Sequence, residues 1–235
     1  MLSIIIPTLN EEDYLSSLLE SIKKQAFGDY EIIISDAGST DATLEIARKY
    51  HCVVTGGGLP AVGRNNGAKI AKGEVLFFLD ADTILPENFL HKSLAEFNVR
   101  KLDFASFCIT PYPYKFFAGF FIELFYNKMI VVMEKILAHS AVGILVKKEV
   151  FEKLGGYDED IKLSEDHDLG RRATKISKFG IIRSARIIVS DRRAQKDGWL
   201  ATGVRYFLCE LYTIFIGPVK SDIFKYKFNH YKEKK

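Results

Sequence analysis

Short apolar runs alternate with amphipathic stretches through the first hundred residues. Residues 2–6 form a β-type run that ends at Pro7, and Leu15, Leu18, Leu19 and Ile22 then follow helical spacing. Further strand-like runs at 31–35, 52–55 and 75–79 alternate with helical stretches at 40–50, 61–71 and 86–99. This β-α order predicts an α/β fold, a mostly parallel sheet with helices on both faces.

The pattern beyond residue 100 is less regular. It predicts strands at 104–109, 142–146 and 181–190, and helices at 115–139, 148–154 and 165–179. We see no repeat and no low-complexity linker. The sequence therefore predicts one continuous domain over residues 1–190, with halves 1–100 and 101–190, and a helical, basic appendage over residues 191–235.

Composition excludes several classes of protein. The chain has 235 residues, 48% of them hydrophobic and 27% charged, which is unlike a disordered, collagenous or disulfide-scaffold protein. The formal net charge of +3 is too small for a chain that binds nucleic acid over its whole surface. Residues 220–235 carry six lysines against two acidic residues, so the basic character belongs to the tail.

Cysteine usage favours a reducing compartment. Cys52, Cys108 and Cys209 are odd in number, widely spaced and set in or beside apolar runs, as buried thiols of a cytoplasmic protein are. The chain enters a strand-like run at Leu2 without a basic leader, so we expect no signal peptide. No uncharged apolar stretch reaches the roughly 20 residues that a membrane span requires.

Polar residues follow three of the predicted strands. Residues 7–11 follow the first strand, residues 36–41 the second and residues 80–82 the fourth. Ligands of open parallel sheets bind beyond the carboxyl ends of the strands, which makes these segments candidates for a binding site. Each segment also has the composition of an ordinary turn or helix cap.

Asp80-Ala81-Asp82 carries the most specific signal. Two carboxylates one residue apart repel each other, and each pKa would rise unless a cation compensates them. A hard divalent cation with oxygen ligands, Mg²⁺ or Mn²⁺, is the natural compensator, and such an ion commonly completes its shell with substrate phosphates. The pair therefore predicts a metal site that binds a nucleoside diphosphate.

Six motifs in order resemble the family 2 glycosyltransferases, which have the GT-A fold. The resemblance covers residues 1–190 and does not identify a substrate. The motifs are Pro7-Thr8-Leu9-Asn10-Glu11, Asp36-Ala37-Gly38-Ser39-Thr40-Asp41, Gly63-Arg64-Asn65-Asn66-Gly67, Asp80-Ala81-Asp82, Gly155-Gly156-Tyr157-Asp158 and Ser164-Glu165-Asp166.

The resemblance implies roles for individual residues. Asp36 would bind the base, Arg64 would lie near the base or diphosphate, and Asp80 near the ribose. Asp80 and Asp82 would bind the metal, and Asp166 would be the catalytic base beside Glu165, which orients the site or the acceptor. The implied nucleotide-binding set is Pro7, Thr8, Leu9, Glu11, Asp36, Arg64, Asp80 and Ala81.

The implied reaction is the transfer of a sugar from a UDP- or GDP-linked donor with inversion. A metal and nearby cations stabilise the departing nucleoside diphosphate, and a carboxylate on the opposite face removes the proton of the acceptor hydroxyl. Glu165 and Asp166 also open a predicted helix, where acidic residues suit the helix dipole without any catalytic role.

The region after residue 190 bears on the acceptor. Arg192 and Arg193 could clamp the diphosphate as a lid closes, or could belong to a solvated loop. Processive relatives carry Gln-x-x-Arg-Trp here, whereas Gln195 is followed by Gly198 and Trp199 in this chain. The departure favours one transfer per binding event, and Trp199 either stacks on an acceptor or packs in the core.

Residues 112–126 contain eight aromatic side chains, and most of the predicted helix 115–139 is apolar. Three interpretations stay open: a buried helix, a homodimer interface, or an element lying in a membrane surface. Apolar residues 206–216 and the lysine- and aromatic-rich tail that follows favour the inner face of the cell membrane. A lipid-linked acceptor, such as a lipid phosphate, would then be expected, with Asp166 orienting rather than deprotonating it.

Two other functions compete with this interpretation. Residues 77–82 superficially resemble the nucleophile motif of haloacid-dehalogenase-type phosphatases, but Ile84 stands where that motif has Thr or Val. A non-catalytic scaffold that binds a nucleotide-sugar or a membrane is the other alternative, although the full set of carboxylates speaks against a decayed site.

Overall fold

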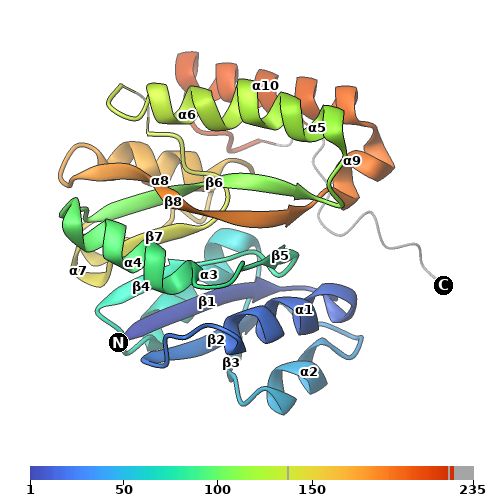
Figure 1. Cartoon of the computed structure of the whole chain (residues 1–235), viewed down its shortest axis with the longest axis vertical. Helices are drawn as coiled ribbons and strands as arrows, with labels where there is room; N and C mark the ends of the chain where they lie inside the picture. Colours follow the sequence, from blue (N-terminus) through green and yellow to red (C-terminus); the bar gives the residue numbers. More distant parts are fainter. Residues whose placement is uncertain (137, 222, 225–235) are drawn as a thin grey trace.

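A computed structural model describes residues 1–136, 138–221 and 223–224, without the side chains of residues 117, 199 and 200. One eight-stranded sheet runs through the molecule in the order β3-β2-β1-β4-β7-β6-β8-β5 (Figure 1). The strands are β1 Leu2–Thr8, β2 Tyr30–Asp36, β3 Val53–Gly56, β4 Val75–Phe78, β5 Thr83–Ile84, β6 Phe104–Tyr112, β7 Ile144–Lys147 and β8 Phe179–Ser190.

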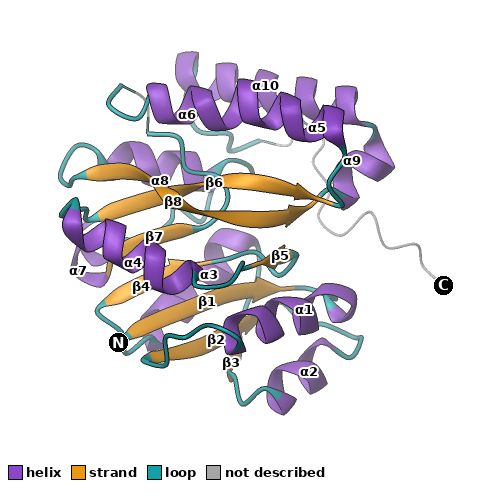
Figure 2. Cartoon of the chain, in the orientation of Figure 1, coloured by secondary structure: helices purple, strands orange, loops and turns teal. Residues whose placement is uncertain are grey.

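Helices cover both faces of this sheet (Figure 2). They are α1 Glu12–Lys23, α2 Thr43–Lys49, α3 Pro60–Ile70, α4 Phe89–Val99, α5 Phe116–Phe121, η1 Ile122–Asn127, α6 Lys128–Val132, α7 Lys148–Lys153, α8 Glu165–Ala173, α9 Arg192–Asp197 and α10 Trp199–Phe215. The α/β fold and its GT-A likeness are confirmed. Four of the seven strand pairings are parallel, and β7 joins the two halves of the sheet by antiparallel pairs with β4 and β6.

Side-chain alternation along the strands divides the core into two layers. In β1, Ile4 and Ile6 pack with residues of α1 and α4, whereas Ile5 packs with residues of α3, α7 and α8. Successive side chains of a strand point to opposite faces, so the continuous apolar run in β1 serves both layers. This is why the central strands lack the polar alternation of a half-exposed sheet.

The predicted helix over 115–139 was too long. A helix begins at Phe116, passes through the π-helical turn η1 and ends at Val132. Asn127, buried in η1, accepts a hydrogen bond from the amide of Ile109 and donates to its carbonyl oxygen. The π turn, which inserts one extra residue, thus brings a polar side chain onto the main chain of β6.

The predicted helix over 165–179 was also too long, because α8 ends at Ala173. The hydroxyl of Thr174 donates to the carbonyl oxygen of Arg171, and the hydroxyl of Ser177 donates to that of Ala173. Side-chain hydroxyls that bond to nearby main-chain groups compete with continuation of the helix. The chain turns there and enters β8 at Phe179.

The aromatic segment is not enclosed by the rest of the described chain, so the buried-helix interpretation was wrong for the single chain. Phe116 of α5 is 72% exposed and Phe125 of η1 is 61% exposed. Phe207 and Phe215 of α10 are exposed as well, and α10 lies at the same end of the molecule as α5 and α6 (Figure 1). In the residues that the structure covers, no helix combines the length and hydropathy needed to cross a bilayer.

The three cysteines are free thiols, but the prediction that all three are buried is wrong for Cys52. Cys108 and Cys209 are buried, and Cys52 is partly exposed. Burial raises the pKa of all three thiols, and that of Cys52 to about 12, which keeps them protonated near neutral pH.

Close packing of α3 on the sheet depends on a glycine. A Cβ atom on Gly67 would lie 2.4 Å from Cγ2 of Ile5 and 2.8 Å from Oγ of Ser35. The glycine lets the backbone of α3 approach β1 and β2. The same helix carries Arg64, so this approach fixes where that side chain enters the sheet edge.

We expect Gly67→Ala to lower the free energy of unfolding by about 1–3 kcal/mol, because the added methyl group overpacks a filled interior. Gly203→Ala in α10 is the control, since a Cβ there meets nothing within 4 Å. Replacing a helical glycine by alanine should leave stability unchanged or raise it by up to about 1 kcal/mol. Urea unfolding of both variants measures the difference, and equal stabilities would contradict the packing argument.

Candidate active site

Three adjacent strands deliver polar side chains to one edge of the sheet. Strand β1 pairs in parallel with both β2 and β4, with Thr8 opposite Asp36. The amide of Leu79 donates to the carbonyl oxygen of Ile5, which continues the β1–β4 pairing to the residue before Asp80. The segments after β1, β2 and β4 therefore lie side by side, as the parallel order predicted.

Arg64 of α3 is the centre of a buried ionic network. Its Nη1 lies 2.6 Å from Oε1 of Glu165, and its Nη2 lies 2.8 Å from Oδ1 of Asp80 and 3.6 Å from Oδ2 of Asp166. Its side chain is 6% exposed, and its guanidinium carbon lies 5.4 Å from the centre of the Tyr157 ring. Although burial lowers the pKa of Arg64, the surrounding carboxylates outweigh it and keep the group charged.

Arg192 of α9 forms the second centre. Its two terminal nitrogens donate to the two carboxylate oxygens of Glu11 at 2.7 and 2.9 Å, and its Nε lies 2.8 Å from Oδ2 of Asp82. The guanidinium carbon stacks 4.4 Å from the centre of the Tyr14 ring. Residues from the segments that follow β1, β4 and β8 thus meet at one cation.

The pKa values reflect an excess of buried acid. Burial raises the pKa of Asp82 to about 6, with Asp80 and Glu11 adding to the rise and Arg192 opposing it. Burial likewise raises the pKa of Asp166, against the opposing effect of Arg64. The hydroxyl of Tyr157 donates a hydrogen bond of 3.0 Å to Oδ1 of Asp166 and fixes that carboxyl group.

The residue types of this edge, rather than their present spacing, suit a hard divalent cation, because no three of its described acids come together as closely as a bound ion needs. Two arginines contact five carboxylates, those of Glu11, Asp80, Asp82, Glu165 and Asp166. Asp191 adds an acidic side chain nearby, because the amide of the preceding Ser190 donates to the carbonyl oxygen of Asp82. One carboxylate oxygen of Asp191, Oδ2, is buried without a hydrogen-bond partner among the described residues. Oxygen donors in excess of positive charge are what Mg²⁺ and Mn²⁺ prefer.

The remaining predicted site residues occupy the same edge or its margin. Asp36 accepts hydrogen bonds from the hydroxyls of Thr8 and Ser39 and from two amides of its own loop. Pro7 and Leu9 are partly exposed, Ala81 is buried between the two acids, and Arg193 follows Arg192 in α9. Trp199 begins α10, but its side chain lies outside the described residues.

Sequence reasoning missed Tyr14, Tyr157 and Asp191 as parts of this edge. Tyr157 belongs to the motif Gly155-Gly156-Tyr157-Asp158, but nothing in the neighbouring sequence indicates that its hydroxyl reaches Asp166. Asp191 directly precedes the predicted arginine clamp, and that adjacency was the available signal.

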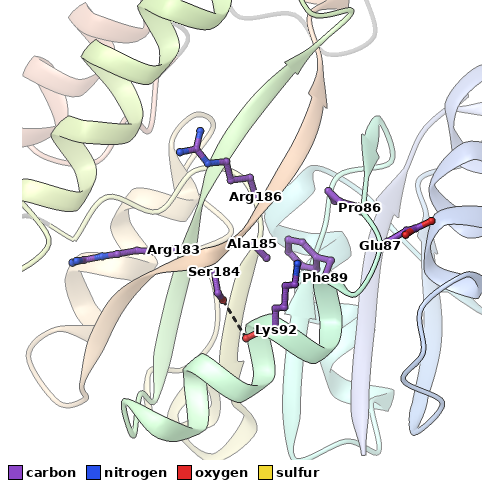
Figure 3. A pocket seen from close by; sticks show the side chains of 8 residues that line it. All are labelled: Pro86, Glu87, Phe89, Lys92, Arg183, Ser184, Ala185 and Arg186. Carbon is purple, nitrogen blue, oxygen red and sulfur yellow. Dashed lines mark hydrogen bonds between the residues drawn. The ribbon is translucent and has the colours of Figure 1, made fainter.

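A separate pocket of about 250 Å³ lies between α4 and β8 (Figure 3). Lys92, Arg183 and Arg186 give it a basic rim, but Arg183 pairs with Glu134 and Arg186 pairs with Glu123. It contains none of the carboxylates around Arg64 and Arg192. We therefore assign the site to the strand-end edge.

Sequence comparison identifies related proteins. The profile described as Glycosyl transferase family 2 matches residues 3–155, which is more than half of the chain. The poly(ribitol-phosphate) beta-N-acetylglucosaminyltransferase TarS of Staphylococcus aureus (strain Mu50) is 36% identical over 103 residues, 40% of this chain and 18% of that protein.

Structural comparison gives the same fold. A crystal structure of S. aureus TarS residues 1–349 in complex with UDP-GlcNAc superposes with a TM-score of 0.66 at 22% identity, covering 80% of this chain and 58% of that chain. The mannosyltransferase PcManGT from Pyrobaculum calidifontis, in complex with GDP-Man and Mn²⁺, gives 0.68 at 19% identity, covering 88% and 64%. The chain thus spans less than two thirds of the length of each of these proteins.

The pKa of Asp82 predicts a pH-dependent effect of Asp82→Asn on stability. Because the folded pKa of about 6 lies above the ordinary value, this carboxyl group favours the folded state at low pH. The contribution is complete below about pH 4 and is lost as the pH rises through about 6. At pH 8 we expect the neutral amide to raise the free energy of unfolding by on the order of 3 kcal/mol, since the pKa lies about two units above its ordinary value and one unit is worth about 1.4 kcal/mol.

At pH 4 the same variant and the wild type should unfold at nearly equal denaturant concentrations. Glu45→Gln on the exposed surface of α2 is the control, with no pH-dependent difference expected. Urea unfolding at the two pH values measures the effect. An equal change at both values, or a loss of stability at pH 8, would contradict the assignment of buried, poorly compensated charge to Asp82.

Proposed function

The chain belongs to glycosyl transferase family 2, and on that basis we propose that it transfers one sugar residue from a nucleoside-diphosphate sugar to a hydroxyl or lipid-phosphate acceptor, with inversion. The observation that carries the proposal is the convergence of Asp80 and Asp82 with Arg64 and Asp166 at one sheet edge. We assign residues 1–190 to the catalytic domain and residues 191–235 to a lid and membrane-associating segment.

The donor is a UDP- or GDP-linked sugar. Structural relatives were solved with UDP-GlcNAc and with GDP-Man, and the strand-end carboxylates of this chain suit a metal–diphosphate group. We assign the nucleoside pocket to Pro7, Thr8, Leu9, Glu11 and Ala81, with Asp36 bound to the base. A comparison of UDP and GDP binding distinguishes a uracil-binding pocket from a guanine-binding one.

Asp80 and Asp82 would hold Mg²⁺ or Mn²⁺, which supplies positive charge to the departing nucleoside diphosphate. Arg192 now satisfies Asp82 and Glu11. Binding of the donor requires Arg192 to exchange Asp82 for another partner, and a diphosphate oxygen is the natural one, because guanidinium binds phosphate in a bidentate manner. Arg192, with Arg193 next to it, then acts as the diphosphate clamp.

Asp166 is the proposed catalytic base for a hydroxyl acceptor. Its Oδ1 is held by the hydroxyl of Tyr157, and its Oδ2 lies 3.6 Å from Arg64. Burial raises the pKa of Asp166, which makes it a stronger base than an exposed carboxylate once it has lost its proton. Glu165, bound to Arg64, orients this network beside the acceptor.

Transfer of a single sugar per encounter fits the junction between α9 and α10. Gly198, where processive relatives carry arginine, has a φ of +88°. Residues with a side chain rarely adopt this conformation, so an arginine would strain the junction. We place the acceptor-stacking role at Trp199, the first residue of α10.

We expect Asp166→Asn to separate binding from catalysis. A nucleoside diphosphate with Mn²⁺ should raise the melting temperature of the variant as much as that of the wild type, because the carboxylate does not hold the donor. Turnover with a hydroxyl acceptor should fall by about 10²- to 10⁴-fold, the usual contribution of a general base. Thermal shift with UDP and GDP, with and without Mn²⁺, and a donor-consumption assay supply the measurements.

Asp160→Asn is the matched control, since Asp160 is exposed and lies outside the network. Unchanged turnover in Asp166→Asn with a hydroxyl acceptor would refute the assignment of the base. The absence of a metal-dependent shift with both UDP and GDP in the wild type would refute the proposed donor class. A shift without turnover in the wild type would favour the non-catalytic scaffold.

We further propose that the exposed apolar faces of α5–η1–α6 and α10 bind an anionic membrane surface. Exposed aromatic and aliphatic side chains occur on both segments, including Phe120, Phe125, Phe207 and Phe215. The acids of the first segment are neutralised, because Glu123 pairs with Arg186, and Glu134 with Arg100 and Arg183.

Exposed lysines, by contrast, flank the same face. Lys115, Lys128 and Lys135 are exposed beside these apolar side chains. An apolar face bordered by positive charge complements an anionic leaflet, at about 1 kcal/mol per basic residue. The lysine-rich residues 225–235, on which the sequence prediction also rests, lie outside the described residues.

The double variant Phe125→Ser/Phe215→Ser tests the membrane surface. Both side chains are exposed, so folding should be retained, while binding to phosphatidylglycerol vesicles should weaken at least about tenfold through lost apolar burial. Vesicle co-sedimentation measures binding, and Val99→Ser, an equally exposed substitution on α4, should bind as the wild type does. Equal binding of all three proteins would contradict the proposal, and a wild-type dimer that the double variant abolishes would favour the homodimer interface instead.

A further inference from the structure

Two histidines and a glutamate from three separate elements meet beside Asp166, on side chains that the strand-end network does not use. His139 lies in the loop between α6 and β7, His167 in the first turn of α8, and Glu210 in α10. Each side chain offers one ligand atom, an imidazole nitrogen or a carboxylate oxygen, and these three atoms lie within 4.8 Å of one another. We call these residues the His–His–Glu cluster.

The pairwise contacts of the cluster are close but incomplete. Nδ1 of His167 lies 2.6 Å from Oε2 of Glu210, within hydrogen-bond distance. Nδ1 of His139 lies 3.8 Å from Oε1 of Glu210, which is too long for a hydrogen bond. The two imidazole rings meet edge to face at 4.4 Å between centroids.

His139 is the member that the protein alone does not explain. It is 7% exposed, and both of its ring nitrogens are buried without a hydrogen-bond partner among the described residues. Its ring also contacts Tyr126 edge to face at 5.1 Å, so aromatic side chains surround it. Buried imidazole nitrogens that lack a partner require an explanation, and an ion bound to the ring would supply one.

The directions of the pKa shifts of His139 and Glu210 agree with this geometry. Burial lowers the pKa of His139, which keeps the imidazole neutral and its nitrogen lone pair available. Burial opposes ionisation of Glu210, but its contacts with the two histidines outweigh burial and lower its pKa, so it is a carboxylate near neutral pH. Neutral imidazole and ionised carboxylate are the forms that bind metal ions.

We propose that His139, His167 and Glu210 bind one Zn²⁺ ion. Two imidazole nitrogens and one carboxylate oxygen are a ligand set that zinc accepts, with water in a fourth position. Donor atoms around a tetrahedral zinc stand roughly 3.3 Å apart, so small side-chain rotations would close the present cluster around the ion. The all-oxygen edge at Asp80 and Asp82 suits Mg²⁺ or Mn²⁺ instead, and the two sites are distinct in ligand chemistry.

A bound zinc ion would fasten α10 to the catalytic domain. Glu210 is the contribution of α10, while His167 directly follows the proposed base Asp166 in α8. The ion would therefore hold the exposed apolar face of α10 at a fixed place relative to the site. Its effect should appear as added stability even when no donor is present.

The experiment uses the full chain, stripped with a chelator and titrated with ZnCl₂ without nucleotide. We expect one zinc per chain by calorimetry and elemental analysis, with a rise in melting temperature. His139→Gln and Glu210→Gln should each weaken zinc binding by at least about 100-fold, since removing even an outer-shell partner costs up to about that much. His91→Gln on the exposed surface of α4, outside both metal sites, should bind zinc as the wild type does.

Co²⁺ substitution of the wild type provides a readout that does not depend on the variants folding. Visible absorption bands typical of a four-coordinate nitrogen and oxygen site would support the proposal. It would be overturned if the wild type showed no binding at micromolar Zn²⁺, or if binding were equally strong in the His139→Gln and Glu210→Gln proteins. Binding lost in Asp82→Asn but kept in the other two variants would move the zinc to the strand-end edge and equally refute it.

Discussion

The organisation of the site depends on one buried cation, the guanidinium of Arg64. It contacts Asp80 after β4 and both Glu165 and Asp166 at the start of α8, so a single side chain ties together elements that are about a hundred residues apart. A buried charge is tolerated only when it is paired. Loss of Arg64 would leave these acids without their partner, and loss of the acids would leave the guanidinium buried and unpaired. The donor edge and the proposed base therefore cannot be positioned independently of each other.

The same network carries more negative charge than its arginines neutralise. Burial is the main cause of the raised pKa values of Asp82 and Asp166, and neighbouring acids of the network add to the rise. Such a site lowers the stability of the isolated chain. It suits a divalent cation, which brings positive charge to the carboxylates, and a diphosphate, which accepts hydrogen bonds from the arginines. We infer that this chain gives up folding stability for donor binding in this way, a common compromise at functional sites.

The sequence predicted what depends on local pattern and failed where distant contacts decide. Strand ends follow from apolar runs, so the order of strands and turns along the chain was enough to assign Asp36, Asp80 and Asp82 to one edge. The contact of Arg192 with Glu11 joins residues 181 positions apart, and no periodicity encodes it. The π turn η1 within the predicted helix 115–139 has the same origin, because Asn127 in that turn bonds to Ile109 of β6, a tertiary contact that the helical pattern does not contain.

The position of β8 in the sheet has a consequence for synthesis of the protein. This strand is the last in sequence, yet it inserts between β6 and β5. Strands β1 to β4 can pair as soon as they leave the ribosome, whereas β6 gains its parallel neighbour only after residues 179–190 have been made. During that interval β6 has an unpaired edge, and a nascent chain stalled before residue 179 presents a template for pairing with other chains.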